Sequence, residues 1–206
     1  MRKNPLAFAL VLALAVTAVP AHGQGLELSG GVNFSKLSGD AVQAARNTGL
    51  NFGLDFVIPV GPIGMNLGAG WSQKGAEETV QNSVNVIDLS YVEVPVHVRL
   101  PLVGAGPVRL NLVLGPTIGI NTGCEIKVDA ATAQDCADVA QGGFDAEKIE
   151  WAGTGGLGVS FSLGGLAYAG VDLQYTLGLS NVSEGSSLDA KSRTFSLSSH
   201  LGFDVF

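Results

Sequence analysis

Apolar and polar residues alternate along most of the chain after about the first two dozen positions. Three of the apolar rows are Leu50-Phe52-Leu54-Phe56-Ile58, Val92-Val94-Val96-Val98-Leu100 and Val108-Leu110-Leu112-Leu114. Side chains of a β-strand point to opposite faces with a period of two residues, so each row is the apolar face of one strand. The pattern predicts an all-β protein.

Eight strands are predicted, with connections that alternate in length. The strands are 26–37, 47–58, 63–76, 85–101, 108–121, 148–162, 166–181 and 192–206. The short connections, rich in Gly or Pro, are 59–62, 102–107 and 163–165, and the longer, mostly polar ones are 38–46, 77–84, 122–147 and 182–191. Alternate connections of an up-and-down barrel lie at the same end. We therefore expect an eight-stranded antiparallel up-and-down β-barrel.

The apolar face of this barrel is expected to face lipid. The strands match the roughly 9–11 residues of a tilted bilayer crossing, and Trp71, Trp151 and Tyr175 fall on the apolar face near the loop ends, where an interfacial aromatic girdle lies. The opposite face is rich in Gly and Ser and carries Glu27, Asn33, Asp55, Asn66, Glu93, Arg99, Arg109, Asn111, Glu150, Asp172, Gln174 and Asp204. A secreted soluble barrel with its apolar face around a ligand is the alternative.

The N-terminus resembles a secretory signal peptide. Arg2 and Lys3 precede an apolar run from Leu6 to Val19, and small residues follow at Ala21 and Gly23. We expect a signal peptide at 1–23 and the barrel domain at 24–206; an uncleaved membrane anchor is the alternative. Cleavage would remove two of the 11 basic residues and none of the 18 acidic ones, which leaves a net charge of −9. So acidic a chain is not expected to bind nucleic acid.

Two segments resemble a known family. Gly31-Val32-Asn33-Phe34-Ser35 in the first strand and Tyr91-Val92-Glu93-Val94-Pro95 in the fourth look like signatures of PorT-type outer-membrane β-barrel proteins, often called porin family proteins. The resemblance implies an eight-stranded barrel in the outer membrane and no shared catalytic activity. An even number of strands then places both termini in the periplasm.

Charged residues on the inward face are expected to form a lumen network. Its predicted members are Glu93, His97, Arg99, Arg109, Asp172 and His200. A buried carboxylate needs a partner, and the candidates for Glu93 are Arg99, Arg109 and Lys74. Such a network either fills a narrow lumen or forms a gate or ligand site. We expect no metal site, because two inward histidines are weak evidence for one.

Cys124 and Cys136 are the only cysteines, and both fall in the longest connection. An even cysteine count in an exported chain predicts a disulfide; two free thiols are the alternative. Several acidic residues surround the pair, so loop 122–147 is the best candidate for contact with an extracellular or envelope protein partner.

These patterns favour a structural or surface-interaction role in contact with outer-membrane lipid. A passive channel for small solutes is the first alternative, and a secreted soluble ligand-binding barrel is the second. No enzymatic activity, catalytic residue or cofactor is expected, because no histidine lies in a predicted loop and the glycine-rich run 153–158 lacks the helix that phosphate binding requires.

Overall fold

The computed structural model describes residues 24–39, 42–43, 45–80, 83–128, 133–136, 146–182 and 190–204. The predicted signal peptide lies outside these residues. The strands are β1 (Gly25–Gly39), β2 (Val42–Gln43), β3 (Ala45–Val60), β4 (Ile63–Val80), β5 (Ser83–Ala105), β6 (Val108–Val128), β7 (Gln134–Asp135), β8 (Ile149–Gly164), β9 (Ala167–Gly178) and β10 (Lys191–Asp204). Among the described residues, no helix is long and apolar enough to cross a membrane.

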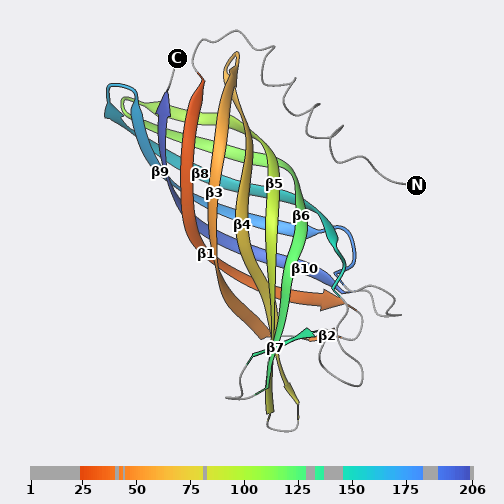
Figure 1. Cartoon of the computed structure of the whole chain (residues 1–206). Helices are drawn as coiled ribbons and strands as arrows, with labels where there is room; N and C mark the ends of the chain where they lie inside the picture. The colour runs from red at the N-terminus through yellow and green to blue at the C-terminus, as the bar shows by residue number, and fades with distance from the viewer. Residues whose placement is uncertain are drawn as a thin grey trace, which may run out of the picture.

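Eight of the strands form a closed ring. Each long strand pairs antiparallel with its neighbour in the sequence, and β10 returns to pair with β1 from Gly25↔Asp204 to Ser38↔Lys191. The short strands β2 and β7 lie outside the ring and pair with β1 and β6 (Figure 1). The predicted eight-stranded antiparallel up-and-down barrel is confirmed, with two short strands that the sequence pattern did not predict.

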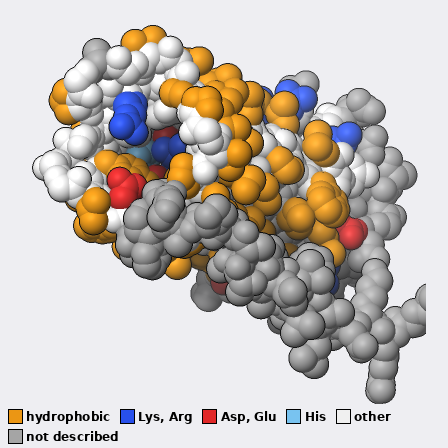
Figure 2. All heavy atoms as spheres, turned by 90° about the horizontal axis from the view of Figure 1, so that it is seen from above, with side chains coloured by type: hydrophobic (Ala, Val, Ile, Leu, Met, Phe, Trp, Pro, Cys, Tyr) orange, Lys and Arg blue, Asp and Glu red, His pale blue; other side chains and the backbone are white. Residues whose placement is uncertain are grey.

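The alternation along each strand separates an apolar exterior from a polar interior. Phe52 is 56% exposed on the outside, whereas Glu27 is only 2% exposed on the inside. Apolar side chains cover much of the outer surface in Figure 2. The apolar rows therefore face outward, as expected for a wall in contact with lipid. A soluble barrel around an apolar ligand would have the opposite arrangement.

One end of the barrel carries three tight turns. Residues 61–62, 106–107 and 165–166 join successive strands, and Gly61, Gly106 and Gly165 begin these turns with φ values of 62°, 58° and 60°. Positive φ is readily adopted only by glycine, which explains the residue type at these positions. β1 begins and β10 ends at this same end (Figure 1). We call it the turn end and the opposite end the loop end.

At the loop end the sheet continues beyond the ring. β4 and β5 remain paired as far as Val80↔Ser83. β6 continues to Val128, although its other neighbour, β8, begins only at Ile149, opposite Ile120. Connections 77–84 and 122–147 were predicted as loops, and this is wrong for residues 77–80, 83–84, 122–128 and 134–135, which are strands. Cross-strand pairing can stabilise a hairpin outside a membrane as well as inside one. We call residues 77–80, 83–90 and 121–128 the extension.

Candidate functional site

Charged and polar side chains from five strands meet inside the barrel near the turn end. Arg99 Nη2 lies 2.8 Å from Glu27 Oε1 and 2.8 Å from Asp172 Oδ2. His200 Nδ1 lies 3.1 Å from the same Asp172 oxygen, and the Tyr168 hydroxyl donates a 3.2 Å hydrogen bond to Glu27 Oε2. Asp55, opposite Glu27 in the β1–β3 register, also lines the lumen cavity. We call these six residues the turn-end cluster.

Neutral polar side chains form the middle layer of the lumen. Thr154 bridges Thr117 and Thr176 through contacts of 3.1 and 3.0 Å between hydroxyl oxygens, which links β6, β8 and β9. On the other side, Asn51 donates a 2.7 Å hydrogen bond to Asn33, which itself donates to Ser72 at 2.9 Å. These bonds satisfy polar groups that the narrow interior removes from bulk water.

A second group of charges, the loop-end cluster, lies on the far side of this layer. Lys74 Nζ is 2.6 Å from Glu93 Oε1 and 3.0 Å from Glu150 Oε2, and it lies 5.0 Å from the centre of the Tyr91 ring. The hydroxyl of Ser192 donates a short hydrogen bond to the second oxygen of Glu150. Lys74, Glu150 and Tyr91 are almost fully buried, so these interactions are only weakly screened by water.

Apolar side chains close the barrel above the loop-end cluster. Leu37, Ala76, Val182 and Ala190 form a buried group that joins β1, β4 and the two ends of the β9–β10 connection. Val182 is fixed by backbone hydrogen bonds of 2.9 Å to Ala190 and to Glu147. A cavity of about 110 Å³ lies below this cap, lined by members of both charge clusters and the neutral layer. The lumen therefore consists of layers of packed side chains around one small cavity.

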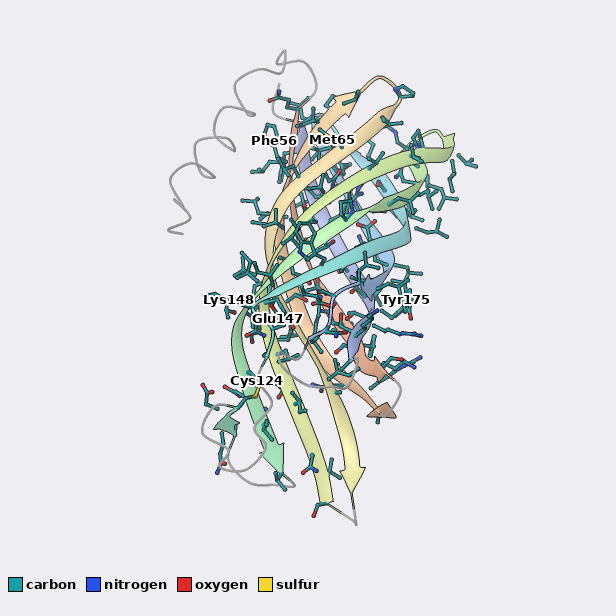
Figure 3. The ribbon with its side chains drawn as sticks, turned by 90° about the vertical axis from the view of Figure 1, so that its right-hand side faces the viewer. Phe56, Met65, Cys124, Glu147, Lys148 and Tyr175 are labelled. Carbon is teal, nitrogen blue, oxygen red and sulfur yellow. A yellow bond between two sulfur atoms is a disulfide. The ribbon has the colours of Figure 1, made fainter. Side chains whose placement is uncertain are left out.

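One cysteine of the pair lies in the extension, and the other directly follows β7. Cys124 and Cys136 form a disulfide with a Cα–Cα distance of 5.5 Å, which ties β6 to the residue after β7. Cys124 lies well beyond the ring in Figure 3, on the opposite side from Phe56 and Met65 near the turn end. Lys127 pairs with Asp88 across β5 and β6 at 2.8 Å, and this hydrogen bond raises the pKa of the lysine.

The sequence matches a known family over most of its length. Residues 21–184 match the family model of the outer membrane protein beta-barrel domain. The chain belongs to this family. Its location is therefore the outer membrane, and its outward apolar rows contact lipid.

Several solved outer-membrane barrels align with this chain. Neisserial surface protein A, from Neisseria, aligns over 89% of this chain and 99% of its own at 10% identity and a TM-score of 0.53. OprG of Pseudomonas aeruginosa aligns over 89% and 96% at 14% identity and a TM-score of 0.48. Ail of Yersinia pestis aligns over 88% and 99% at 16% identity and a TM-score of 0.44. No curated protein matches this chain in sequence. At these identities the likeness to Neisserial surface protein A concerns the fold alone.

The structure separates the predicted lumen residues of this outer-membrane barrel into two groups. Arg99, Asp172 and His200 meet in the turn-end cluster, while Glu93 lies in the loop-end cluster and pairs with Lys74 instead of an arginine. His97 contacts Thr117 in the neutral layer, with Nε2 3.0 Å from the hydroxyl.

Arg109 lies outside both clusters. It is an exposed residue at the turn end and makes no ion pair with the described residues. Its parity along β6 is inward, but it is the second residue after the β5–β6 turn and its side chain is exposed. The lumen network predicted from the sequence therefore does not include it.

Sequence reasoning placed Glu27, Asp55 and Glu150 on the inward face without assigning their partners. The sequence analysis overlooked Tyr168. This residue lies an even number of positions from Asp172 on β9, so the alternation would have placed it on the inward face. The partners themselves could not be found, because they depend on the tilt and stagger of the strands around the barrel.

The structure predicts that Lys74 is essential to the stability of the lumen. Replacing it with methionine (Lys74→Met) leaves Glu93 and Glu150 buried without their cation, which should reduce the free energy of unfolding by roughly 3–5 kcal/mol. Urea-induced unfolding of the barrel in lipid vesicles measures this loss.

Lys127→Met is the matched control, because Lys127 also pairs with a carboxylate but is exposed. We expect a change of roughly 0–1 kcal/mol for that variant. Equal losses for the two variants would contradict the assignment of Lys74 to a buried, paired site.

Proposed function

We propose that this outer-membrane barrel has a structural or surface-interaction role and is neither an open pore nor an enzyme. The observation that carries the proposal is the set of ion pairs across the lumen: Arg99 joins β5 to β1 and β9, and Lys74 joins β4 to β5 and β8. An eight-stranded barrel has an interior just wide enough to be filled by side chains. Solute passage would require these pairs to separate in a poorly hydrated interior.

The extension supports the surface role. It projects beyond the ring at the loop end, and its disulfide holds β7 against β6 (Figures 1 and 3). Glu125, Asp135 and Glu147 give this region an acidic character, while Asp129, Asp138 and Asp145 of the same predicted loop lie outside the described residues. We infer that segment 122–147 is the contact surface for an extracellular or envelope protein partner.

We propose the orientation that follows from this role. Residues 1–23 are a cleaved signal peptide, both ends of the barrel domain 24–206 are periplasmic, and the loop end faces outward. The position of Gly25 and Asp204 beside the short turns supports this arrangement, since such barrels have short periplasmic turns and longer external loops. The Tyr91–Pro95 and Gly31–Ser35 segments support placing the chain among PorT-type members of its family.

The closed lumen predicts little or no steady conductance. Purified barrel inserted into a planar lipid bilayer should give no reproducible open-channel steps, because charged side chains cross the lumen in two layers. The same protein preparation should first show heat-modifiable migration on a gel, which confirms that the barrel under test is folded. Large, regular steps from the unmutated protein would refute the closed lumen and favour the passive channel.

The proposed orientation predicts that the disulfide is exposed on intact cells. A large maleimide reagent that cannot cross the outer membrane should label Cys124 and Cys136 only after a reductant is added. The control is a Leu166→Cys reporter at the β8–β9 turn, in a chain with both native cysteines replaced by serine; Leu166 is exposed at the turn end. It should react only after the outer membrane is permeabilised. The reverse pattern would place the extension in the periplasm.

A further inference from the structure

We propose that the turn-end cluster binds a divalent metal ion of the zinc type through Glu27, Asp172 and His200. One oxygen or nitrogen of each of these buried side chains lies within 4.8 Å of those of the other two. They come from the adjacent strands β1, β9 and β10. One imidazole nitrogen and two carboxylate oxygens form a three-ligand set typical of zinc sites that keep a fourth position for water.

The second observation concerns His200. Its side chain is completely buried, yet neither ring nitrogen has a hydrogen-bond partner among the described residues. Nδ1 comes within 3.1 Å of Asp172 Oδ2 without hydrogen-bond alignment, and Nε2 is 3.9 Å from Glu27 Oε2. Two ligands of one ion are roughly 3.0–3.4 Å apart when the metal–ligand bonds are about 2.1 Å. One ion takes only one of the two ring nitrogens, and the 3.1 Å between Nδ1 and Asp172 Oδ2 falls in this range.

Each carboxylate has one oxygen that Arg99 contacts and one that it does not. Asp172 Oδ2, the oxygen nearest His200 Nδ1, is also contacted by Arg99. The guanidinium contacts Oε1 of Glu27 and Oδ2 of Asp172. Oε2 of Glu27 accepts from the Tyr168 hydroxyl, and Oδ1 of Asp172 is buried without a hydrogen-bond partner. Hydrogen bonds from neighbours orient ligating carboxylates and tune their affinity for the metal. Arg99 and Tyr168 are thus positioning residues for the ligands.

Acidic groups outnumber basic ones in the cluster. Glu27, Asp55 and Asp172 are three carboxylates beside the single guanidinium of Arg99. Buried carboxylates need compensating positive charge, which a divalent cation would add.

Glycines make room for the proposed ligands. A Cβ atom on Gly158 would collide with Oδ1 of Asp172, and one on Gly170 would collide with Nε2 of His200. A Cβ atom on Gly202 would collide with the Tyr168 ring. Glycines, which have no side chain, therefore lie in the barrel wall directly beside the cluster. The view from above, onto the turn end, shows acidic, basic and histidine side chains inside the opening (Figure 2).

Zinc binding by the whole barrel tests the site. The purified protein is treated with a chelator, and Zn²⁺ alone is then titrated against a chromophoric competitor. We expect one equivalent to bind to the unmodified barrel, with affinity reduced at least about tenfold in His200→Gln. His97→Gln is the matched control: it removes the other lumen histidine, which contacts Thr117 outside the cluster, and should bind as the unmodified barrel does.

A second measurement avoids variants that fail to fold. X-ray absorption at the zinc edge of the loaded, unmodified barrel should show one histidine and otherwise oxygen ligands. Folding of each variant is checked by its heat-modifiable migration. Failure of the unmodified barrel to bind Zn²⁺, equal binding by His200→Gln, or a spectrum without a histidine contribution would each overturn the proposal.

Discussion

The requirement that no backbone hydrogen-bonding group is left unpaired in lipid governs this structure. The hydrocarbon core of a membrane supplies no water to N–H and C=O groups, so a β-sheet can cross it only as a closed ring. The pairing of β10 with β1 provides this closure over fourteen register positions, from Gly25↔Asp204 to Ser38↔Lys191. Closure then fixes the direction of every side chain, because residues of one parity face lipid and those of the other face the lumen.

The narrow lumen follows from this closure and determines what the inward residues are. Eight strands leave little volume, so the inward positions combine glycine with small polar residues and a few long charged ones. The charged residues cannot remain unpaired away from water. They therefore form two clusters, one around Arg99 and the other around Lys74, with hydroxyl and amide groups between them. The same ion pairs that compensate the buried charges also occupy the lumen, which is why we propose that this barrel has no open pore.

Much of this architecture could be predicted from the sequence, because the signal has a period of two and requires no knowledge of distant contacts. The strands, the outward rows and the inward parity of Glu93, Asp172 and His200 all follow from it. Partner identity does not, since Lys74 meets Glu93 through the pairing of β4 with β5, and Glu150 comes from a strand on the other side of β6. Parity also carries no information about height along the barrel axis, so it could not show that Arg109 lies apart from both clusters. The tip of the β4–β5 hairpin was missed because residues 77–83 are almost all polar and lack the alternation that marks the strands of the ring.

The claim that the outward rows lie in lipid is the basis of the whole account. Leu157, near the middle of β8, and Val128, at the end of β6 beyond the ring, are 47% and 46% exposed, so they differ mainly in their surroundings. The direct measurement is the unfolding free energy, in lipid vesicles, of Leu157→Arg compared with Val128→Arg. If the ring spans the bilayer, Leu157→Arg should lose roughly 2–4 kcal/mol, as charged residues at the bilayer midplane do, and Val128→Arg should lose little. Equal and small losses at the two positions would contradict a lipid-facing wall.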